Sequence, residues 1–265
     1  MSLKHSILEL DIIDYSEDVY RIPPVRVNTL FPEPSRLEDL LLIDPFKSML
    51  IDWVEDLDEM PAAVLLHGPA GCGKTTVARI ISQMNEFIMY DDWQQSFGLE
   101  RDNCKILYLN GSQIRQTGVA SLKKALDIYM TATASCARTL LIIDESHDLT
   151  EVAVNLLKQA TEMNAVRTRL HGQGGNILLL STQAVIGDAQ LMTRVFPIDC
   201  GKFDANQLMK YTLKCLNDAG VLYEEKEVRA LWDKTGSPRG FLNMLNPIAK
   251  HSLKHGTKMD LKSIL

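Results

Sequence analysis

The spacing of apolar and polar positions changes several times along the chain, and the changes predict alternating strands and helices. Four short apolar runs end in glycine, polar or acidic residues: 62–68, 105–112, 138–145 and 176–183. Runs of this length are typical of strands that are buried on both faces of a parallel sheet. Helical spacing over 75–84 and 118–135 separates some of them, so the order predicts an α/β fold in which helices flank a parallel sheet.

The region between residues 37 and 60 has helical spacing of its own. Apolar side chains recur there every three or four residues and share one face: Phe46, Met49, Leu50, Trp53 and Leu57. Such a stripe predicts an amphipathic helix that packs on the core. Residues 85–104 are irregular and partly acidic, and they predict no regular element.

Both ends of the chain differ from this central part. Residues 1–36 contain four prolines, which interrupt any long helix or strand, so we expect an extended arm. After Lys202 no strand pattern remains, and the spacing is that of several helices. The sequence therefore predicts three parts, an arm over 1–36, an α/β domain over 37–202 and a small helical domain over 203–265.

Composition narrows the class of protein. The 265 residues are 46% hydrophobic and 23% charged, which suits one large domain and one small one. No stretch approaches the roughly 20 apolar residues of a membrane span, so we expect no membrane partner and a cytoplasmic location. The five cysteines form no C-x-x-C pair and indicate neither a disulfide framework nor a zinc site. A net charge of -6 means that any DNA contact needs a local basic patch or several subunits.

A glycine-rich segment, GPAGCGKT, follows the first apolar run and opens the next helix. It fits the phosphate-loop pattern G-x-x-x-x-G-K-[ST], in which backbone N–H groups and a helix N-terminus surround phosphates. In that pattern Lys74 reaches the β and γ phosphates, and the Thr75 hydroxyl holds Mg²⁺. We therefore predict ATP and Mg²⁺ as ligands, with these loop residues in contact: Gly68, Pro69, Ala70, Gly71, Cys72, Gly73, Lys74, Thr75 and Thr76.

Two adjacent acidic residues complete this predicted site. The apolar run 140–143 delivers Asp144 and Glu145 to the carboxyl end of a strand, which is where ligands bind in open parallel sheets. Asp144 can order the metal ion together with Thr75, and Glu145 can activate the attacking water. The pair predicts hydrolysis of the bound nucleotide.

With these residues in place, the chain resembles AAA+ ATPases, and among them the ATPase subunits of bacterial and phage sliding-clamp loaders. The resemblance runs from about residue 37 to 246 and rests on PAAVLLHGPAGCGKTTVARI, LYLNGSQ, LLIIDESHDLTEVAVNLLKQATE, NILLLSTQ and TGSPRGFLNML. DESHDLT with AVNLLKQATE is the most specific part, and NGSQIRQTGV is similar to the phage loaders. The resemblance implies a P-loop domain, a helical lid domain, ATP hydrolysis, and a bacterial or phage-infected cell as the source.

The resemblance also implies roles for residues outside the phosphate loop. Gln183 stands where the family keeps a polar sensor of the γ-phosphate, although asparagine is usual there. Arg194, in LMTRVFPI, matches the arginine that the family inserts into the ATP site of a neighbouring subunit, although Thr193 and Val195 differ from the pattern. Arg239, in GSPRG, matches the second sensor, which contacts the phosphates of its own subunit.

Several other polar residues keep two interpretations. Asn110 is either a polar partner of the catalytic glutamate or a cap at the strand end. His147 matches a family position, but the simpler interpretation as a loop residue is favoured. Basic residues form two short clusters, which are either solvated faces or a shared path for a phosphate backbone. The first lies in a glycine-rich loop expected over 163–176, and the second near the start of a helix: Arg167, Arg169 and His171, and Arg115, Lys123 and Lys124.

The partners implied are other AAA+ subunits, DNA and a sliding clamp. Clamp-loader subunits continue into a helical collar, whereas this chain stops at Leu265. A short phage-like form, a truncated chain, a helicase loader and a transposition target-selection ATPase all stay open. A non-hydrolysing ATP-binding scaffold subunit is a further alternative, and the presence of Lys74, Thr75, Asp144 and Glu145 argues against it.

Overall fold

A computed structural model describes residues 29–55, 59–84, 88–89, 104–134, 138–171 and 175–261. The predicted arm therefore lies outside the described residues from 1 to 28. Among the described residues, no helix combines the length and the apolar character that a membrane span requires.

The centre of the fold is a six-stranded sheet with the order β2-β3-β4-β5-β1-β6, and every pair of neighbours is parallel. The strands are β1 Ala63–His67, β2 Ile88–Met89, β3 Cys104–Asn110, β4 Arg138–Asp144, β5 Asn176–Ser181 and β6 Phe196–Asp199. The predicted α/β fold with a parallel sheet is confirmed. Two strands were not predicted, because β2 has only two residues and β6 contains a proline. Pro197 is tolerated because β6 pairs with β1 alone and is an edge strand.

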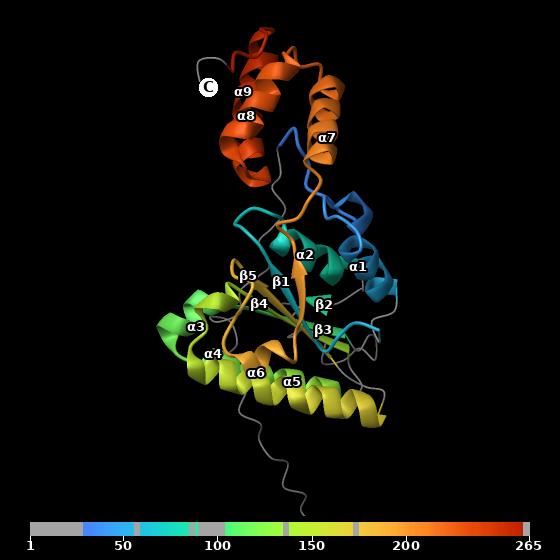
Figure 1. Ribbon diagram of the computed structural model, residues 1–265, viewed down its shortest axis with the longest axis vertical. Helices are drawn as coiled ribbons and strands as arrows, with labels where there is room; N and C mark the ends of the chain where they lie inside the picture. The colour runs from blue at the N-terminus through green and yellow to red at the C-terminus, as the bar shows by residue number, and fades with distance from the viewer. Residues whose placement is uncertain are drawn as a thin grey trace, which may run out of the picture.

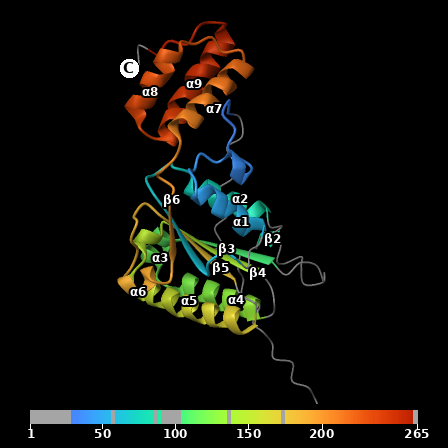
Figure 2. The same cartoon turned by 45° about the vertical axis from the view of Figure 1, so that its right-hand side comes forward.

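Helices cover both faces of this sheet (Figures 1 and 2). On one side lie α1 Phe46–Glu55 and α2 Lys74–Met84, and on the other α4 Ala120–Ala134 and α5 Glu151–His171. Strand side chains alternate between the two layers, so Val64 and Leu66 pack with the first pair while Ala63 and Leu65 pack with the second. The apolar stripe predicted for 37–60 faces the core, with Leu50 and Trp53 buried. Leu57 lies outside the described residues.

The expected loop at 163–176 is wrong for most of its length. Helix α5 continues to His171, because no glycine or proline interrupts its sequence before residue 172. Buried Asn164 then closes the connection to β5, since its amide accepts a hydrogen bond from Gly175 N and donates one to Gly175 O. A further short helix, α3 Gly111–Thr117, follows β3 directly.

Three helices form a cluster of their own beyond the sheet, and we refer to them as the lid (Figure 1). They are α7 Ala205–Asp218, α8 Glu225–Thr235 and α9 Pro238–His255. Their core contains fully buried Phe241 and Leu245, and Trp232 stacks edge-on against Phe241 with ring centroids 5.7 Å apart. We propose that this cluster is a separate small domain beginning near residue 203.

Residues 29–42 connect the lid to the sheet layer. Phe31 is buried in the lid core, and Leu30 N donates to Asn246 Oδ1 of α9 at 2.9 Å. Two residues later Glu33 pairs with Arg79 of α2 at 2.5 Å. Further on, Leu41 O accepts a hydrogen bond from Asp204 N at the start of α7. Within this segment residues 29–36 form no helix or strand, a 3-10 helix covers Leu37–Asp39, and the segment contacts both the lid and the sheet layer.

The Glu33–Arg79 pair gives a test of this anchoring. The Arg79 side chain is only 9% exposed, so Glu33→Ala leaves a buried cation without its partner. We expect the free energy of unfolding to fall by about 1.5–3 kcal/mol, as for hydrogen bonds to charged groups. Urea denaturation measures the change, and Glu38, which is exposed, supplies the matched control Glu38→Ala. Equal stability of the two variants would contradict the anchoring role.

Candidate nucleotide site

The phosphate loop is the turn between β1 and α2, and its backbone conformation requires glycine. Gly68 and Gly71 have φ angles of +140° and +83°, which side chains with a Cβ rarely adopt. A Cβ on Gly68 would also lie 2.7 Å from Gly201 N, so the loop packs tightly against the chain that follows β6. The first N–H groups of α2, which begins at Lys74, have no partners within the helix and suit a phosphate group.

Lys74 lies inside the curve of this loop. Its ammonium donates to Gly68 O at 2.8 Å and to Pro69 O at 3.0 Å, and the residue is 9% exposed. The neighbouring Cys72 thiol has a raised pKa, because burial outweighs the opposing effect of Lys74. A neutral thiol adds no negative charge where phosphates are expected.

The carboxylate of Asp144 meets the phosphate loop. Thr75 Oγ1 donates to Asp144 Oδ2 at 3.3 Å, so the two predicted metal ligands are brought together. Tyr108 of β3 donates to the same oxygen at 2.8 Å, and Glu145 N donates to Oδ1 at 2.8 Å. No sequence motif marks Tyr108, because only the pairing of β3 with β4 brings it beside Asp144.

Glu145 occupies a strained position. Its φ of +51° lies in the left-handed region, which is uncommon for a residue other than glycine and clusters at functional sites. A Cβ on Gly111 would collide with the carbonyl of Glu145, so glycine is needed directly behind this turn. The Glu145 side chain is 45% exposed and is therefore open to solvent.

His147 is more closely involved than its interpretation as a loop residue suggested. Its Nε2 lies 3.4 Å from Glu145 Oε2 and 3.2 Å from Thr182 Oγ1, and its side chain is 16% exposed. The ring thus stands between the acidic end of β4 and the polar end of β5. Only the three-dimensional pairing of the two strands shows this, since residues 147 and 182 are far apart in the chain.

Asn110 and Gln183 lie at the same edge of the sheet as Asp144, with different contacts from those predicted. Asn110 is opposite Asp144 in the strand register, and its Oδ1 accepts from Gln113 N at 3.3 Å to cap α3. Gln183 is exposed, and its N–H donates to Ser181 Oγ at 2.8 Å. Within the described part of the chain, no hydrogen bond joins either side chain to Glu145. The capping interpretation of Asn110 therefore has structural support.

The two predicted arginines lie on opposite sides of the fold. Arg239 is at the start of α9, and a Cβ added to Gly71 would lie 2.6 Å from Arg239 Cβ, so the lid packs directly on the phosphate loop. Arg194 lies between α6 Ala189–Met192 and β6, before the amino end of that strand. Its guanidinium is 3.5 Å from Glu162 of α5. The fold brings Arg239 to the loop and leaves Arg194 away from it.

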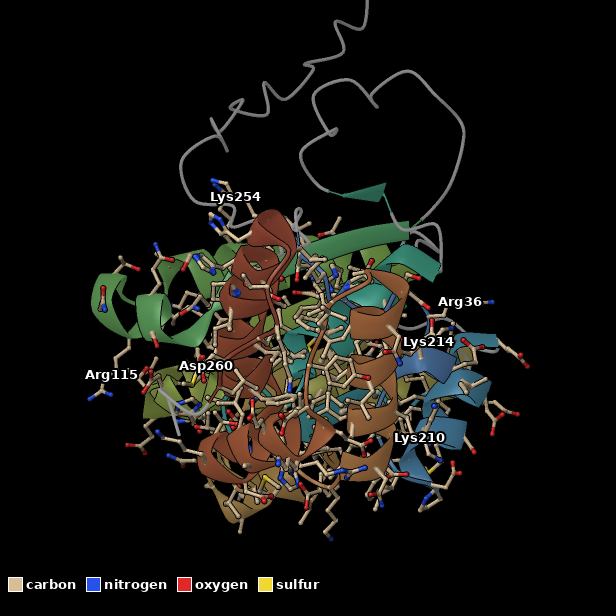
Figure 3. The ribbon with its side chains drawn as sticks, turned by 90° about the horizontal axis from the view of Figure 1, so that it is seen from above. Arg36, Arg115, Lys210, Lys214, Lys254 and Asp260 are labelled. Atoms are coloured by element: carbon tan, nitrogen blue, oxygen red, sulfur yellow. The ribbon has the colours of Figure 1, made fainter. Side chains whose placement is uncertain are left out.

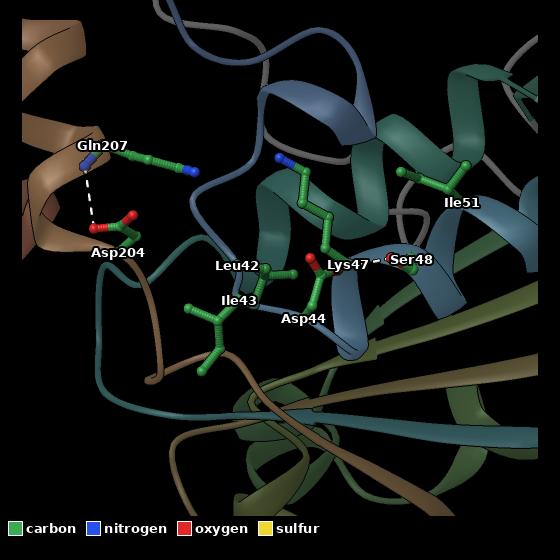
Figure 4. Close-up of a pocket in the computed structure, with 8 residues that line it drawn as sticks. All are labelled: Leu42, Ile43, Asp44, Lys47, Ser48, Ile51, Asp204 and Gln207. Carbon is green, nitrogen blue, oxygen red and sulfur yellow. Dashed lines mark hydrogen bonds between the residues drawn. The ribbon is translucent and has the colours of Figure 1, made fainter.

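A surface pocket lies beside the start of α7, where the chain enters the lid (Figure 4). The start of α1, the chain before it and the start of α7 line this pocket: Leu42, Ile43, Asp44, Lys47, Ser48, Ile51, Asp204 and Gln207. None of these is a predicted site residue. We place the candidate site at the phosphate loop, because Lys74, Thr75 and Asp144 supply the charge and the oxygen donors that a nucleotide with its metal requires.

The residues present fit a magnesium nucleotide. Thr75 and Asp144 offer hard oxygen donors, which Mg²⁺ prefers, and Mg²⁺ takes its remaining ligands from water and phosphates. Across the described ranges, no group of three or more His, Cys, Asp or Glu residues could hold a metal ion alone. A metal shared with a bound phosphate therefore suits this donor set better than a metal held by protein side chains only.

Two relatives illustrate what this chain resembles among known proteins. The chain is 28% identical over 231 residues to ATPase WRNIP1 of Dictyostelium discoideum, covering 83% of this chain and 22% of that protein. It is 31% identical over 152 residues to the Holliday junction branch migration complex subunit RuvB of a Wolbachia strain from Brugia malayi, covering 56% of this chain and 36% of RuvB. The chain thus spans well under half the length of these relatives.

A solved structure shares the fold. The Thermotoga maritima RuvB Holliday junction branch migration motor superposes with a TM-score of 0.59 at 19% identity, covering 87% of this chain and 70% of that one. At this identity the likeness concerns the fold alone. The model of the ATPase family associated with various cellular activities (AAA) matches residues 64–211, from β1 into the lid. This match covers more than half of the sequence, and the chain belongs to the AAA family of ATPases.

Proposed function

We propose that this chain binds ATP with Mg²⁺ and hydrolyses it as one subunit of an oligomer that acts on DNA. The observation that carries the proposal is the convergence of the phosphate loop, Asp144 and Arg239 at one edge of the sheet. These groups come from three distant parts of the sequence. Their chemistry is that of a site for a polyphosphate and a divalent cation.

Binding follows from the charges of the loop. Lys74 and the N-terminus of α2 attract phosphate oxygens, and Lys74 exchanges its two loop carbonyls for the nucleotide. Arg239 closes the site from the lid side, where it already lies against Gly71. Bound Mg²⁺ neutralises charge on the β and γ phosphates, and Thr75 with Asp144 would hold it.

Hydrolysis requires a base beside the γ-phosphate. Glu145 is the one predicted catalytic carboxylate at this edge, and its exposed side chain can accept a proton from water. His147 lies 3.4 Å from that carboxylate and orients it toward the end of β5. Glu145 follows Asp144 in a left-handed turn, and we assign the two acids separate roles, proton acceptor and metal ligand.

Arg194 completes a neighbouring site in this proposal. The phosphate loop and Asp144 lie at the carboxyl ends of the parallel strands, whereas Arg194 precedes the amino end of β6. Its partner Glu162 is 64% exposed, and such surface pairs contribute only about 0–1 kcal/mol, so a neighbour's phosphates can replace it. A planar guanidinium suits the charge that develops on a transferred phosphoryl group.

DNA as the effector rests on the relatives and on the distribution of cations. The RuvB relative is named as a subunit of a branch migration complex that acts on Holliday junctions. Exposed Arg115 lies at one margin of the face viewed in Figure 3, and exposed Lys210 and Lys214 of α7 lie near the other. One subunit offers only a few of these cations. An oligomer would repeat them in each subunit and so present more of them to a phosphate backbone.

Two kinds of DNA partner are favoured by different observations. The segments DESHDLT, AVNLLKQATE and TGSPRG support a clamp-loader-like subunit that acts with a sliding clamp at primed junctions in replication. The 31% identity to RuvB supports a motor on four-way junctions. A helicase loader and a transposition target-selection ATPase use the same chemistry on other DNA.

Lys74→Ala and Glu145→Gln test the two halves of the reaction. We expect Lys74→Ala to weaken ATP binding about 10- to 100-fold, because it removes a hydrogen-bonded charge from the phosphates. Glu145→Gln should bind ATP normally while turnover falls about 10²- to 10⁴-fold, because only the base is lost. Equilibrium binding and steady-state hydrolysis separate these effects, and exposed Lys202→Ala is the matched control. Equal loss of binding in both variants would sink the assignment of roles.

Arg194→Ala tests the oligomeric site. The variant should bind ATP normally but hydrolyse it about 10³-fold more slowly, which is the lower end of the effect on kcat of an arginine supplied to a phosphoryl-transfer site. Mixing it with Glu145→Gln subunits should restore part of the activity, because some interfaces then pair an intact arginine with an intact glutamate. Arg229→Ala, on α8 and paired with Glu225, should behave as the parent protein. Absence of recovery, with activity independent of protein concentration, would rule out the shared site.

A panel of DNA substrates at fixed ionic strength tests the partner. We expect hydrolysis to rise most with a primed junction and a sliding clamp if the loader proposal holds, and with a four-way junction if the RuvB-like proposal holds. Single-stranded DNA with a helicase, or long duplex DNA with filaments, would indicate the remaining alternatives. Binding should weaken with salt in every case, because phosphate contacts release counterions. No stimulation by any DNA would contradict the DNA part of the proposal.

A further inference from the structure

Tyr108 is a buried hydroxyl group that contacts the candidate site from outside the nucleotide motifs. It lies on β3 and is 7% exposed, within the cluster that contains Val77 of α2 and Ile142 of β4. Its Oη donates a hydrogen bond to Asp144 Oδ2 at 2.8 Å. Phenylalanine would fill the same core space, so packing alone does not account for the hydroxyl.

The same carboxylate oxygen faces the phosphate loop. Asp144 Oδ2 accepts from Thr75 Oγ1 at 3.3 Å, while Oδ1 accepts from Glu145 N at 2.8 Å. Of these three donors, the Thr75 hydroxyl is itself expected to turn its oxygen to a cation. The Glu145 N–H belongs to the residue next in sequence and fixes only Oδ1. Tyr108 is the donor on Oδ2 that is held independently of the loop.

The Tyr108 hydroxyl stays protonated and so continues to donate its hydrogen bond to Asp144. Burial raises the pKa of Tyr108, and the charge of Asp144 raises it further, so the hydroxyl keeps its proton. Side chains that orient the ligands of a metal are known to affect metal affinity strongly, because a carboxylate on a single bond otherwise rotates among orientations. The ring itself is fixed by the surrounding core.

We infer that Tyr108 is a positioning residue for the Mg²⁺ that accompanies the nucleotide, and that it acts by holding the Asp144 carboxylate toward Thr75. The inference rests on the proposed function, since it requires a magnesium nucleotide at this site. The role predicts a specific defect. Without the hydroxyl, the loop should bind nucleotide with unchanged affinity in the absence of Mg²⁺. A higher Mg²⁺ concentration should then be needed to raise that affinity.

Tyr108→Phe isolates this role, because it removes one oxygen and leaves the ring. The probe is a fluorescent ATP analogue, titrated first in excess chelator and then over a range of free Mg²⁺ concentrations. In chelator we expect Tyr108→Phe to bind the analogue with the affinity of the parent protein. We expect the free Mg²⁺ concentration that gives half of the increase in affinity to rise about 10-fold, which is the lower end of the effect of residues that orient metal ligands.

Tyr129→Phe is the matched control. Tyr129 is a fully buried tyrosine on α4, in the cluster on the other face of the sheet, so its loss of a hydroxyl is equally hidden from solvent. This variant should keep the Mg²⁺ midpoint of the parent protein. Thermal melting of both variants shows whether a change comes from folding, and Tyr108→Leu provides a second variant without the hydroxyl.

The outcomes are distinct. A parental Mg²⁺ midpoint in either folded Tyr108 variant overturns the inference. An equal fall of affinity with and without Mg²⁺ also overturns it, because that result assigns Tyr108 to packing of the loop. If the parent protein binds no nucleotide under either condition, the proposed function fails and the inference fails with it.

Discussion

The Asp144 carboxylate is the point at which the separate parts of the candidate site are joined, because donors from β3, the phosphate loop and the following residue converge on it. A parallel sheet makes this convergence possible. It brings the carboxyl ends of β3, β4, β5 and β1 to one edge, and each strand there ends in a polar residue or in the loop. Gly111 then allows the backbone behind Glu145 to approach closely. The site therefore depends on strand order as much as on its own residues.

The lid is joined to this edge of the sheet in two places. One is the chain near residue 203, which leads from β6 to α7, and the other is the segment 29–36. Phe31 packs in the lid core, and Glu33 pairs with Arg79, which lies on the same helix as Lys74 and Thr75. A movement of the lid relative to α2 must strain or break this connection. Arg239 of the lid lies against Gly71, so the segment that precedes α1 and the phosphate loop both contact the lid. Residues 29–36 thus connect the lid core to the helix that begins in the phosphate loop, and none of these described residues is a predicted ligand.

The sequence predicted the parts of the site whose chemistry is local. Spaced glycines, a lysine before a helical pattern and an acid after an apolar run are all visible within short segments, and they led to the phosphate loop and to Asp144. Contacts that depend on strand pairing were not visible in this way. No pattern in the sequence connects Tyr108 with Asp144 or His147 with Thr182, because only the order of the sheet places these side chains together. Strand β6 was missed for a different reason. Pro197 lies within this short strand, and a proline argues against a strand unless the strand lies at the edge of the sheet.

The position of Arg194 follows from the same sheet geometry. A strand of four residues such as β6 spans about 13 Å, and Arg194 precedes its amino end while Gly201 at the other end touches the phosphate loop. Arg194 therefore lies toward the edge of the sheet opposite to the phosphate loop, where its guanidinium is 3.5 Å from the exposed carboxylate of Glu162 of α5. An arginine in this place serves catalysis only if a second subunit presents its own phosphate loop to it. The fold thus makes a shared site a condition for any catalytic use of Arg194.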